Sequence, residues 1–166
     1  MSIKDGKTVN VLMVGVGGQG IILSSNILSR AAMLEGYDVK KSEIHGMSQR
    51  GGSVFSHVRY GAEVFSPVIP QGEADIILSL EKLETVRWAS HGRPDALAVY
   101  MRTEILPANT EAYPAGVDDE IKRLFSKVID IDPEEFKARV GNPKTFNVAL
   151  LGVLSPHLSL GEESFM

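Results

Sequence analysis

The sequence predicts an α/β protein, a three-layer α/β/α sandwich around a mostly parallel, doubly wound Rossmann-like sheet. Short apolar segments rich in β-branched residues alternate along the chain with segments whose apolar residues recur at helical spacing. A glycine cluster, Gly15 to Gly20, separates the first apolar segment from the first helical one, where such folds make a tight turn. The 166 residues fit a single domain over 1–166, since one domain usually has roughly 100 to 200 residues.

The first predicted unit is a strand, a glycine turn, a helix and a second strand. Residues 9–14 are apolar and partly β-branched, which predicts a strand, and residues 37–44 predict the next one. Between them, helical spacing predicts an amphipathic helix that stops at Gly36. Its expected apolar stripe comprises Gly20, Leu23, Ile27, Ala31 and Leu34, with Leu28 beside it and Ser24 and Ser25 off it. Because such crossovers nearly always join parallel strands, we expect the two strands to be parallel.

The rest of the chain alternates in the same way. Residues 45–52 are expected to form a polar loop, and residues 53–60 a strand that places Val58 and Tyr60 on one face and Phe55 and His57 on the other. Further strands are expected at residues 74–80, 97–101 and 128–131. Further helices are expected at residues 81–90, 118–126, 133–139 and 144–154. Asp132 suits the N-cap of the helix that begins at residue 133, a proline.

Composition and charge exclude several classes of protein. The chain has 17 Lys and Arg against 21 Asp and Glu, a formal net charge of −4, and no basic tract, so we expect no nucleic acid partner. No apolar run approaches the roughly 18 residues of a membrane span, and no signal peptide is evident, so we expect no membrane association and a cytoplasmic location. Cysteine is absent, which excludes thiolate-held iron-sulfur or zinc sites, and the histidines lack metal-ligand spacing. We therefore expect no bound metal.

Gly15, Gly17 and Gly20 match the G-x-G-x-x-G pattern of dinucleotide-binding turns. In that pattern the first glycine makes the turn, the second lets a phosphate approach the backbone, and the third lets helix and strand pack closely. The alternative is a turn that needs its glycines for geometry alone. A dinucleotide site would also need an acidic residue about 20 positions after the last glycine, where this chain has Lys40 and Lys41. Ordinary dinucleotide binding is therefore the second hypothesis.

Two motifs together carry a resemblance to a known family. The glycine cluster is the first, and the second lies within residues 42–59. They read Gly15-Val16-Gly17-Gly18-Gln19-Gly20 and, in the second, His45-Gly46-Met47-Ser48-Gln49-Arg50-Gly51-Gly52. The pair resembles the gamma-type subunit of 2-oxoacid (pyruvate/ketoisovalerate) ferredoxin oxidoreductases, and within that family it most resembles the beta subunit of indolepyruvate ferredoxin oxidoreductase. The resemblance is dense over residues 9–80 and thinner to residue 154.

The resemblance implies the small subunit of a heteromeric enzyme complex, not active alone. Such a complex decarboxylates a 2-oxoacid oxidatively, here an aryl pyruvate, and gives aryl-acetyl-CoA, carbon dioxide and reduced ferredoxin. Thiamine diphosphate and the [4Fe-4S] clusters belong to the large partner subunit, and coenzyme A enters the complex, so this chain alone is expected to bind no cofactor. The implied partners are the large thiamine-diphosphate-binding subunit and, through the complex, ferredoxin. A homodimer in isolation, a stand-alone dinucleotide-binding oxidoreductase and a non-catalytic scaffold stay open.

Both motifs are expected at the carboxyl edge of the sheet, where doubly wound folds bind ligands. The candidate cofactor-binding residues, none of them catalytic, are Gly15, Gly17, Gly18, Gln19, Gly20, His45, Gly46, Met47, Ser48, Gln49, Arg50, Gly51 and Gly52. Arg50 can clamp a phosphate or carboxylate with two hydrogen bonds, or stand at an interface. His45 can act as an acid or base, or only hydrogen-bond, and His57 is expected to be structural. Forming a carbanion at a carbonyl carbon needs an electron sink that side chains lack, so the chemistry is assigned to the partner.

Overall fold

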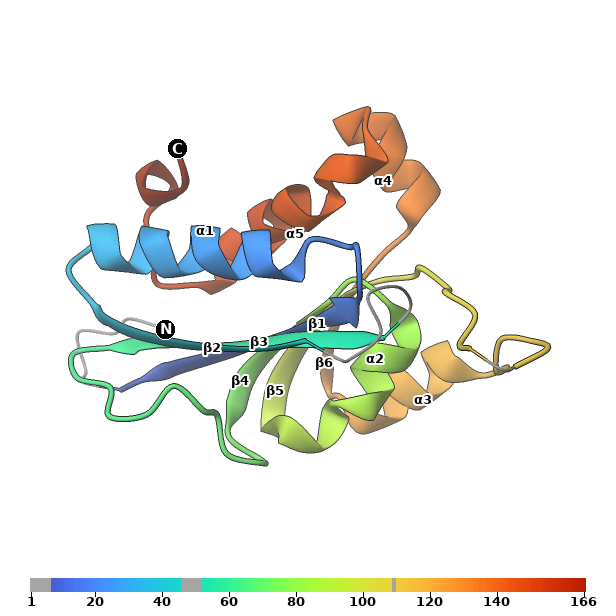
Figure 1. Cartoon of the computed structure of the whole chain (residues 1–166), viewed down its shortest axis with the longest axis horizontal. Coiled ribbons are helices and arrows are strands. Elements are labelled where there is room, and N and C mark those ends of the chain that lie inside the picture. Colours follow the sequence, from blue (N-terminus) through green and yellow to red (C-terminus); the bar gives the residue numbers. More distant parts are fainter. Residues whose placement is uncertain (1–6, 46–51, 109) are drawn as a thin grey trace.

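One six-stranded sheet, in the order β2-β3-β1-β4-β5-β6, forms the centre of the computed structural model, which describes residues 7–45, 52–108 and 110–166 (Figure 1). The strands are β1 (Val9–Val16), β2 (Asp38–His45), β3 (Ser53–Gly61), β4 (Ala74–Ser79), β5 (Gly92–Met101) and β6 (Lys127–Ile131). The helices are α1 (Ile21–Leu34), α2 (Lys82–Arg87), α3 (Val117–Leu124), α4 (Pro133–Val140) and α5 (Phe146–Leu154). Short 3-10 helices are η2 (Ala89–His91), η3 (Pro143–Thr145), η4 (Ser155–His157) and η5 (Glu162–Phe165).

Helices cover both faces of the sheet, which confirms the three-layer prediction (Figure 1). Helices α1, α4 and α5 lie on one face and α2 and α3 on the other. The alternation of β1 divides its side chains between two cores: Met13 packs with the α1 and α5 side, and Leu12 with the α2 and α3 side. Tyr60 and Tyr100, both fully buried, belong to the first and second core respectively. The sheet is therefore an interior layer. Its faces are covered by helices, and ligands can reach it at the two ends of its strands.

Strand β3 changes the expected topology. It runs antiparallel to both of its neighbours and separates β1 from β2, with Val58 opposite Val11 on one side and Lys41 on the other. The predicted strand–helix–strand unit is present, and β1 and β2 point the same way, but they are not adjacent. The physical reason is the short connection after β2, which turns the chain straight back into the sheet. The other pairs, β1 with β4, β4 with β5 and β5 with β6, are parallel.

Helix α1 buries a face that overlaps the predicted stripe only in part, at Leu28 and Ala31. Its buried residues are Ile21, Ser24, Ser25, Leu28, Ala31 and Ala32. Leu23 and Leu34, expected in the core, are 52% and 65% exposed. Small side chains let α1 approach the sheet and α5 closely. The Ser24 hydroxyl donates to the backbone carbonyl of Asn147 (3.0 Å), and the Ser25 hydroxyl donates to the backbone carbonyl of Ile22 (2.9 Å). The two serines are thus buried without an unpaired hydroxyl.

The start of α4 agrees with its predicted cap. The Asp132 carboxylate accepts from the N–H groups of Glu134 (2.8 Å) and Glu135 (3.1 Å), and α4 begins at Pro133 as expected. The last long helix begins at Phe146, because the preceding residues form η3. Strand β5 begins at Gly92 rather than at residue 97. These boundaries set the carboxyl ends of β1, β4 and β5 side by side.

Candidate functional site

The glycine turn between β1 and α1 is made by two left-handed glycines. Gly18 has φ 96° and Gly20 has φ 81°, a region that residues with a Cβ avoid. Gly15 still belongs to β1, and a Cβ there would lie 2.8 Å from Oε1 of Gln19 and 2.9 Å from Cδ1 of Ile21. The roles expected from the motif are therefore exchanged. Gly15 permits close packing of helix on strand, and Gly18 and Gly20 make the turn.

Gln19 joins this turn to the neighbouring strand. Its Oε1 accepts from the N–H of Val16 (2.8 Å), and its Nε2 donates to the carbonyl of Leu80, just after β4 (2.7 Å). Strands β1 and β4 are parallel neighbours whose following helices lie on opposite faces, so the winding of the fold reverses between them. This reversal is where doubly wound sheets open a ligand crevice. Gln19 ties the two sides of that opening together.

Asn147, at the start of α5, holds the turn from the helix side. Its Nδ2 donates to the carbonyl of Gly20 (3.0 Å), and its own carbonyl accepts from the Ser24 hydroxyl. A Cβ at Gly20 would collide with the Asn147 side chain, which is itself only 5% exposed. Sequence reasoning missed Asn147, since its signal is a lone amide in the otherwise apolar segment of α5.

The second motif meets the first through one backbone hydrogen bond. The N–H of Gly17 donates to the carbonyl of Gly52 (2.9 Å), and the paired register places Ser53 opposite Val16. The backbone of His45, the last residue of β2, lies opposite Val54 of β3. Both ends of the second motif therefore stand at the same edge of the sheet as the glycine turn. The candidate residues Gly46, Met47, Ser48, Gln49, Arg50 and Gly51 lie outside the described residues, as does the side chain of His45.

A crevice of about 670 Å³ opens beside the glycine turn. Its walls come from the turn, from the residues that follow β4 and β5, and from the first part of α4 and the segment leading into α5. Among its lining residues are Gly18, Gln19, Leu80, Thr103, Lys137 and Lys144. Gly18 meets no atom within 4 Å of the position of a Cβ, so its backbone is open to a ligand. The size falls within the roughly 300 to 1,000 Å³ of small-molecule sites.

The crevice carries two cations that no carboxylate neutralises. Of its three cationic side chains, Arg102 pairs with Asp132 (3.2 Å). Lys137 and Lys144 form no ion pair with any residue that the structure describes. Against these two lysines the lining has one carboxylate without an ion pair among the described residues, Glu134, so its unpaired groups keep a net positive charge, which favours an anion. No motif marks these two lysines, which lie more than a hundred positions along the chain from the glycine turn, so the sequence could not reveal them.

Lys82 fixes the wall of the crevice that follows β5. Its N–H donates to the carbonyl of Thr103 (3.1 Å), and its Nζ pairs with Glu104 (2.7 Å) and Asp118 (2.6 Å). Burial opposes the charge on Lys82, but the carboxylates of Asp118 and Glu104 outweigh it and raise the pKa of the lysine. The ammonium therefore stays charged, and Glu104 stays neutralised at the rim.

Glu81 is the second anchor of this wall. Its carboxylate is 1% exposed and accepts from the hydroxyl of Tyr113 (2.6 Å) and from the N–H groups of Glu84 (2.9 Å) and Ile105 (3.3 Å). Burial and the bond to Glu81 raise the pKa of Tyr113 well above its ordinary range, so the hydroxyl keeps its proton and donates. The loop between β5 and α3 is thus fastened to the end of β4 at several points.

His57 is structural, as predicted. Its ring is 4% exposed, and its Nδ1 accepts from the N–H of Ile69 (3.2 Å). Burial, then the neighbouring His91 and Arg59, lower the pKa of His57 to about 4, so it is neutral near pH 7. In the described ranges, no group of three or more His, Asp or Glu residues could hold a metal ion. Nor does any described helix have the length and apolar character needed to span a bilayer.

The fold and the crevice define an α/β subunit of an oxidoreductase family. The pyruvate ferredoxin/flavodoxin oxidoreductase family matches residues 10–166 of this chain, and the chain belongs to that family. Among curated relatives, it is 38% identical to the indolepyruvate oxidoreductase subunit IorB of Thermococcus kodakarensis, over 95% of this chain and 82% of the relative. It is 29% identical to the pyruvate/ketoisovalerate oxidoreductases common subunit gamma of Pyrococcus abyssi, over 89% of this chain and 76% of the relative.

Solved structures share the fold at low sequence identity. Pyruvate oxidoreductase subunit PORC from Thermotoga maritima superposes with a TM-score of 0.70 at 14% identity, over 96% of this chain and 82% of that one. The 2-oxoglutarate:ferredoxin oxidoreductase of Magnetococcus marinus, solved with 2-oxoglutarate, coenzyme A and succinyl-CoA, also gives 0.70, at 18% identity, over 96% of this chain and 26% of that one. These solved structures therefore share the overall fold of this chain.

Proposed function

We propose that this chain is the small subunit of a 2-oxoacid:ferredoxin oxidoreductase of the indolepyruvate type, and that it works only within its complex. In that reaction an aryl pyruvate loses carbon dioxide, its acyl group passes to coenzyme A, and the electrons pass to ferredoxin. Relatives named as indolepyruvate oxidoreductase subunit IorB are 37% to 38% identical to this chain. The gamma subunits of pyruvate/ketoisovalerate oxidoreductases are less similar, at 25% to 29%.

One observation carries the proposal: the hydrogen bond from Gly17 to Gly52 joins the two motifs at one edge of the sheet. Either motif alone would fit several functions. Joined, they lie at the sheet edge where the glycine turn borders a crevice, whose unpaired cations among the described residues are Lys137 and Lys144. The candidate residues of the second motif, Arg50 included, start from this edge and stay predictions.

Coenzyme A fits the donors of this crevice. Its phosphate groups are anions, and ammonium groups and backbone N–H groups at a glycine turn are the donors that bind phosphate. In the proposed complex, Lys137 and Lys144 hold the phosphates, and the open backbone at Gly18 lets the ligand approach the turn. Coenzyme A supplies the thiol that accepts the acyl group. The role of this chain is to bind and orient, because these side chains offer charge and hydrogen bonds rather than a nucleophile.

The redox and decarboxylation chemistry is assigned to the partner. The chain has no cysteine, so it cannot supply thiolates to an iron-sulfur cluster. Stabilising a carbanion at a carbonyl carbon needs an electron sink such as thiamine diphosphate, which no side chain replaces. The large thiamine-diphosphate-binding subunit, the [4Fe-4S] clusters and ferredoxin are therefore parts of this proposal rather than of this chain.

The stand-alone dinucleotide hypothesis fits the structure less well. In dinucleotide-binding folds the residue that binds the ribose ends the strand next to the first one. Here β3 occupies that place, and β2 lies two strand spacings, roughly 10 Å, from β1. Lys40 and Lys41, considered for a phosphorylated ribose, are paired within β2 with Asp38 and Glu43.

Reconstitution tests the proposed function. The chain mixed with its large partner subunit, indolepyruvate, coenzyme A and a viologen dye is expected to reduce the dye, and each subunit alone is not. Pyruvate and 2-oxoglutarate in place of indolepyruvate are expected to give slower turnover. Inactivity of a folded pair with its clusters and thiamine diphosphate in place would overturn the proposal, as would nicotinamide-dependent turnover by this chain alone.

A further inference from the structure

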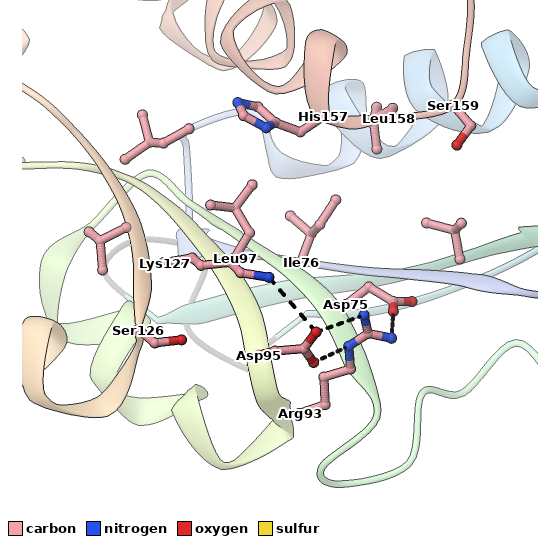
Figure 2. Close-up of a pocket in the computed structure, with 13 residues that line it drawn as sticks. Asp75, Ile76, Arg93, Asp95, Leu97, Ser126, Lys127, His157, Leu158 and Ser159 are labelled. Atoms are coloured by element: carbon pink, nitrogen blue, oxygen red, sulfur yellow. Dashed lines mark hydrogen bonds and ion pairs between the residues drawn. The ribbon is translucent and has the colours of Figure 1, made fainter. Parts of the chain in front are cut away.

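A second cavity, of about 540 Å³, lies at the opposite end of the sheet from the glycine turn (Figure 2). It opens where the parallel strands begin, at the first residues of β1, β4, β5 and β6. It forms because α5 is short and continues into η4, so the helical layer stops before it has covered these strands. None of its lining residues belongs to the crevice described above, so the two sites are separate.

The cavity has an apolar floor and an apolar roof. Val9, Ile76, Leu97 and Ile129 form the floor, since they point from four neighbouring strands into the same core. Leu158 lies across the gap from Ile76 and Leu97, on the segment that crosses above the sheet (Figure 2). Two facing apolar surfaces over this volume suit a flat or branched apolar group.

A row of alternating charges borders the cavity at the strand starts (Figure 2). Arg93 pairs with Asp75 on one side, and its Nε lies 2.7 Å from Oδ1 of Asp95 on the other. Asp75 is further occupied by the N–H of Asn10 (2.8 Å). Lys127 ends the row 3.8 Å from Asp95, which is too long for a hydrogen bond. Both carboxylates are therefore engaged by Arg93, while the Lys127 ammonium keeps its donors free.

The other polar side chains that line the cavity also lack hydrogen-bond partners among the described residues. Ser126 and Ser159 offer hydroxyls and His157 an imidazole, and no described residue hydrogen-bonds these three side chains. The Nε–H of Arg93 is buried and makes no hydrogen bond with the described part of the chain, despite its nearness to Asp95. The four-charge row is neutral in sum, and the serines and the imidazole can each donate or accept. The groups that select the ligand are therefore the Lys127 ammonium and the Arg93 Nε–H, which only donate and so favour an acceptor.

We propose that this cavity binds a small carboxylic acid with an apolar body, as a site distinct from the coenzyme A crevice and independent of the proposed function. The body lies between the strand floor and Leu158. The carboxylate faces the Lys127 ammonium, and Ser126, Ser159 and His157 supply further donors. A cation with an apolar body is disfavoured, because the carboxylates of Asp75 and Asp95 are already paired with Arg93.

Calorimetric titration of the full chain with phenylacetate tests the site. Saturable binding is expected. Acetate is expected to bind at least about tenfold more weakly because it lacks the apolar body, whose burial contributes that factor or more. Phenethylamine is expected to bind at least about tenfold more weakly because its ammonium cannot accept the charge-assisted hydrogen bond. Lys127→Met is expected to weaken phenylacetate binding by the same factor. Lys127 is exposed, so Lys127→Met is expected to fold as the unchanged protein does, and its unfolding midpoint checks that.

The matched control is Lys144→Met, which removes a cation from the other site and is expected to leave phenylacetate binding unchanged. Methyl resonances of Ile76, Leu97 and Leu158 are expected to shift on titration, whereas those of Leu80 are not. The proposal is overturned if phenylacetate does not saturate, if phenethylamine binds equally well, or if Lys144→Met and not Lys127→Met abolishes binding.

Discussion

His57 links the stability of the sheet to pH through one buried imidazole. Its ring packs among other rings, 5.5 Å from that of Phe55 and 6.3 Å from that of His91, centroid to centroid. Burial chiefly holds the pKa of His57 near 4, against 6.5 in the unfolded chain. Between these two values the unfolded chain binds the extra proton and the folded chain does not. The contribution of His57 to stability is therefore complete above pH 6.5 and is lost as the pH falls toward 4.

We accordingly expect the free energy of unfolding to fall between pH 6.5 and pH 4, with His57 responsible for up to about 3 kcal/mol of the loss. His57→Asn keeps an acceptor for the N–H of Ile69 but cannot be protonated, so its stability should depend less steeply on pH in this window. Urea unfolding at a series of pH values measures the difference. His157→Asn, at an exposed histidine, is the control and should retain the full slope. Equal slopes for His57→Asn and the unchanged protein would contradict the assignment.

At the residue scale the sequence revealed conformation better than contact. The glycine cluster at residues 15–20 indicated a turn, and the turn is there, although Gly18 and Gly20 make it and not Gly15. A left-handed backbone favours glycine and so leaves a visible mark in the sequence. Asn147 left no such mark, although it binds the carbonyl of Gly20 from far along the chain. Contacts between distant positions depend on the packing of whole helices, which one sequence does not disclose. For the same reason Lys137 and Lys144 could not be assigned to the crevice in advance.

At the scale of elements, strand β3 and helix α1 show why direction and face are harder to predict than existence. The alternation of apolar and polar residues over 53–60 does not depend on the direction of the strand. The pattern therefore predicted the strand but not its antiparallel place between β1 and β2. In α1, hydrophobicity favoured Leu23 and Leu34 for the core, whereas the sheet accepted Ser24 and Ser25. Close approach of two elements favours small side chains over apolar ones when their hydroxyls can be paired.

Gln19 hydrogen-bonds both the last residue of β1 and the residue that follows β4, so its removal tests how these elements are held. Gln19→Ala would leave the N–H of Val16 and the carbonyl of Leu80 without these partners, at a cost of about 2 to 4 kcal/mol in the free energy of unfolding. Gln71→Ala, in an exposed turn, removes the same side chain where it holds nothing and should change stability little. The urea midpoints of the two variants give the comparison. Equal midpoints would mean that the clasp adds no stability.

At the scale of the whole molecule, the two ends of the sheet serve different purposes. The carboxyl edge gathers both motifs, the left-handed turn and the unneutralised lysines, and the amino edge carries the second cavity. A single domain over 1–166, a cytoplasmic location and a homodimer in isolation stay predictions. The family resemblance could be drawn from two short motifs because their residues are close in sequence. The crevice beside the glycine turn could not, because its walls come from five separate segments.

The lysines of the crevice allow the binding role to be separated from catalysis in the assembled complex. If Lys137 and Lys144 hold the phosphates of coenzyme A, replacing both with Ala should raise the KM for coenzyme A at least about tenfold and leave kcat unchanged, because the reacting thiol lies away from the phosphates. The difference in KM between the double variant and the unchanged protein should shrink at high salt. Salt screens the lysine–phosphate attraction in the unchanged protein, so the loss of the two lysines then matters less. Lys122→Ala, an exposed lysine on α3, is the matched control and should behave as the unchanged protein. A double variant with an unaltered KM would place coenzyme A elsewhere while leaving the subunit assignment intact, because that assignment depends on reconstituted turnover and not on these two side chains.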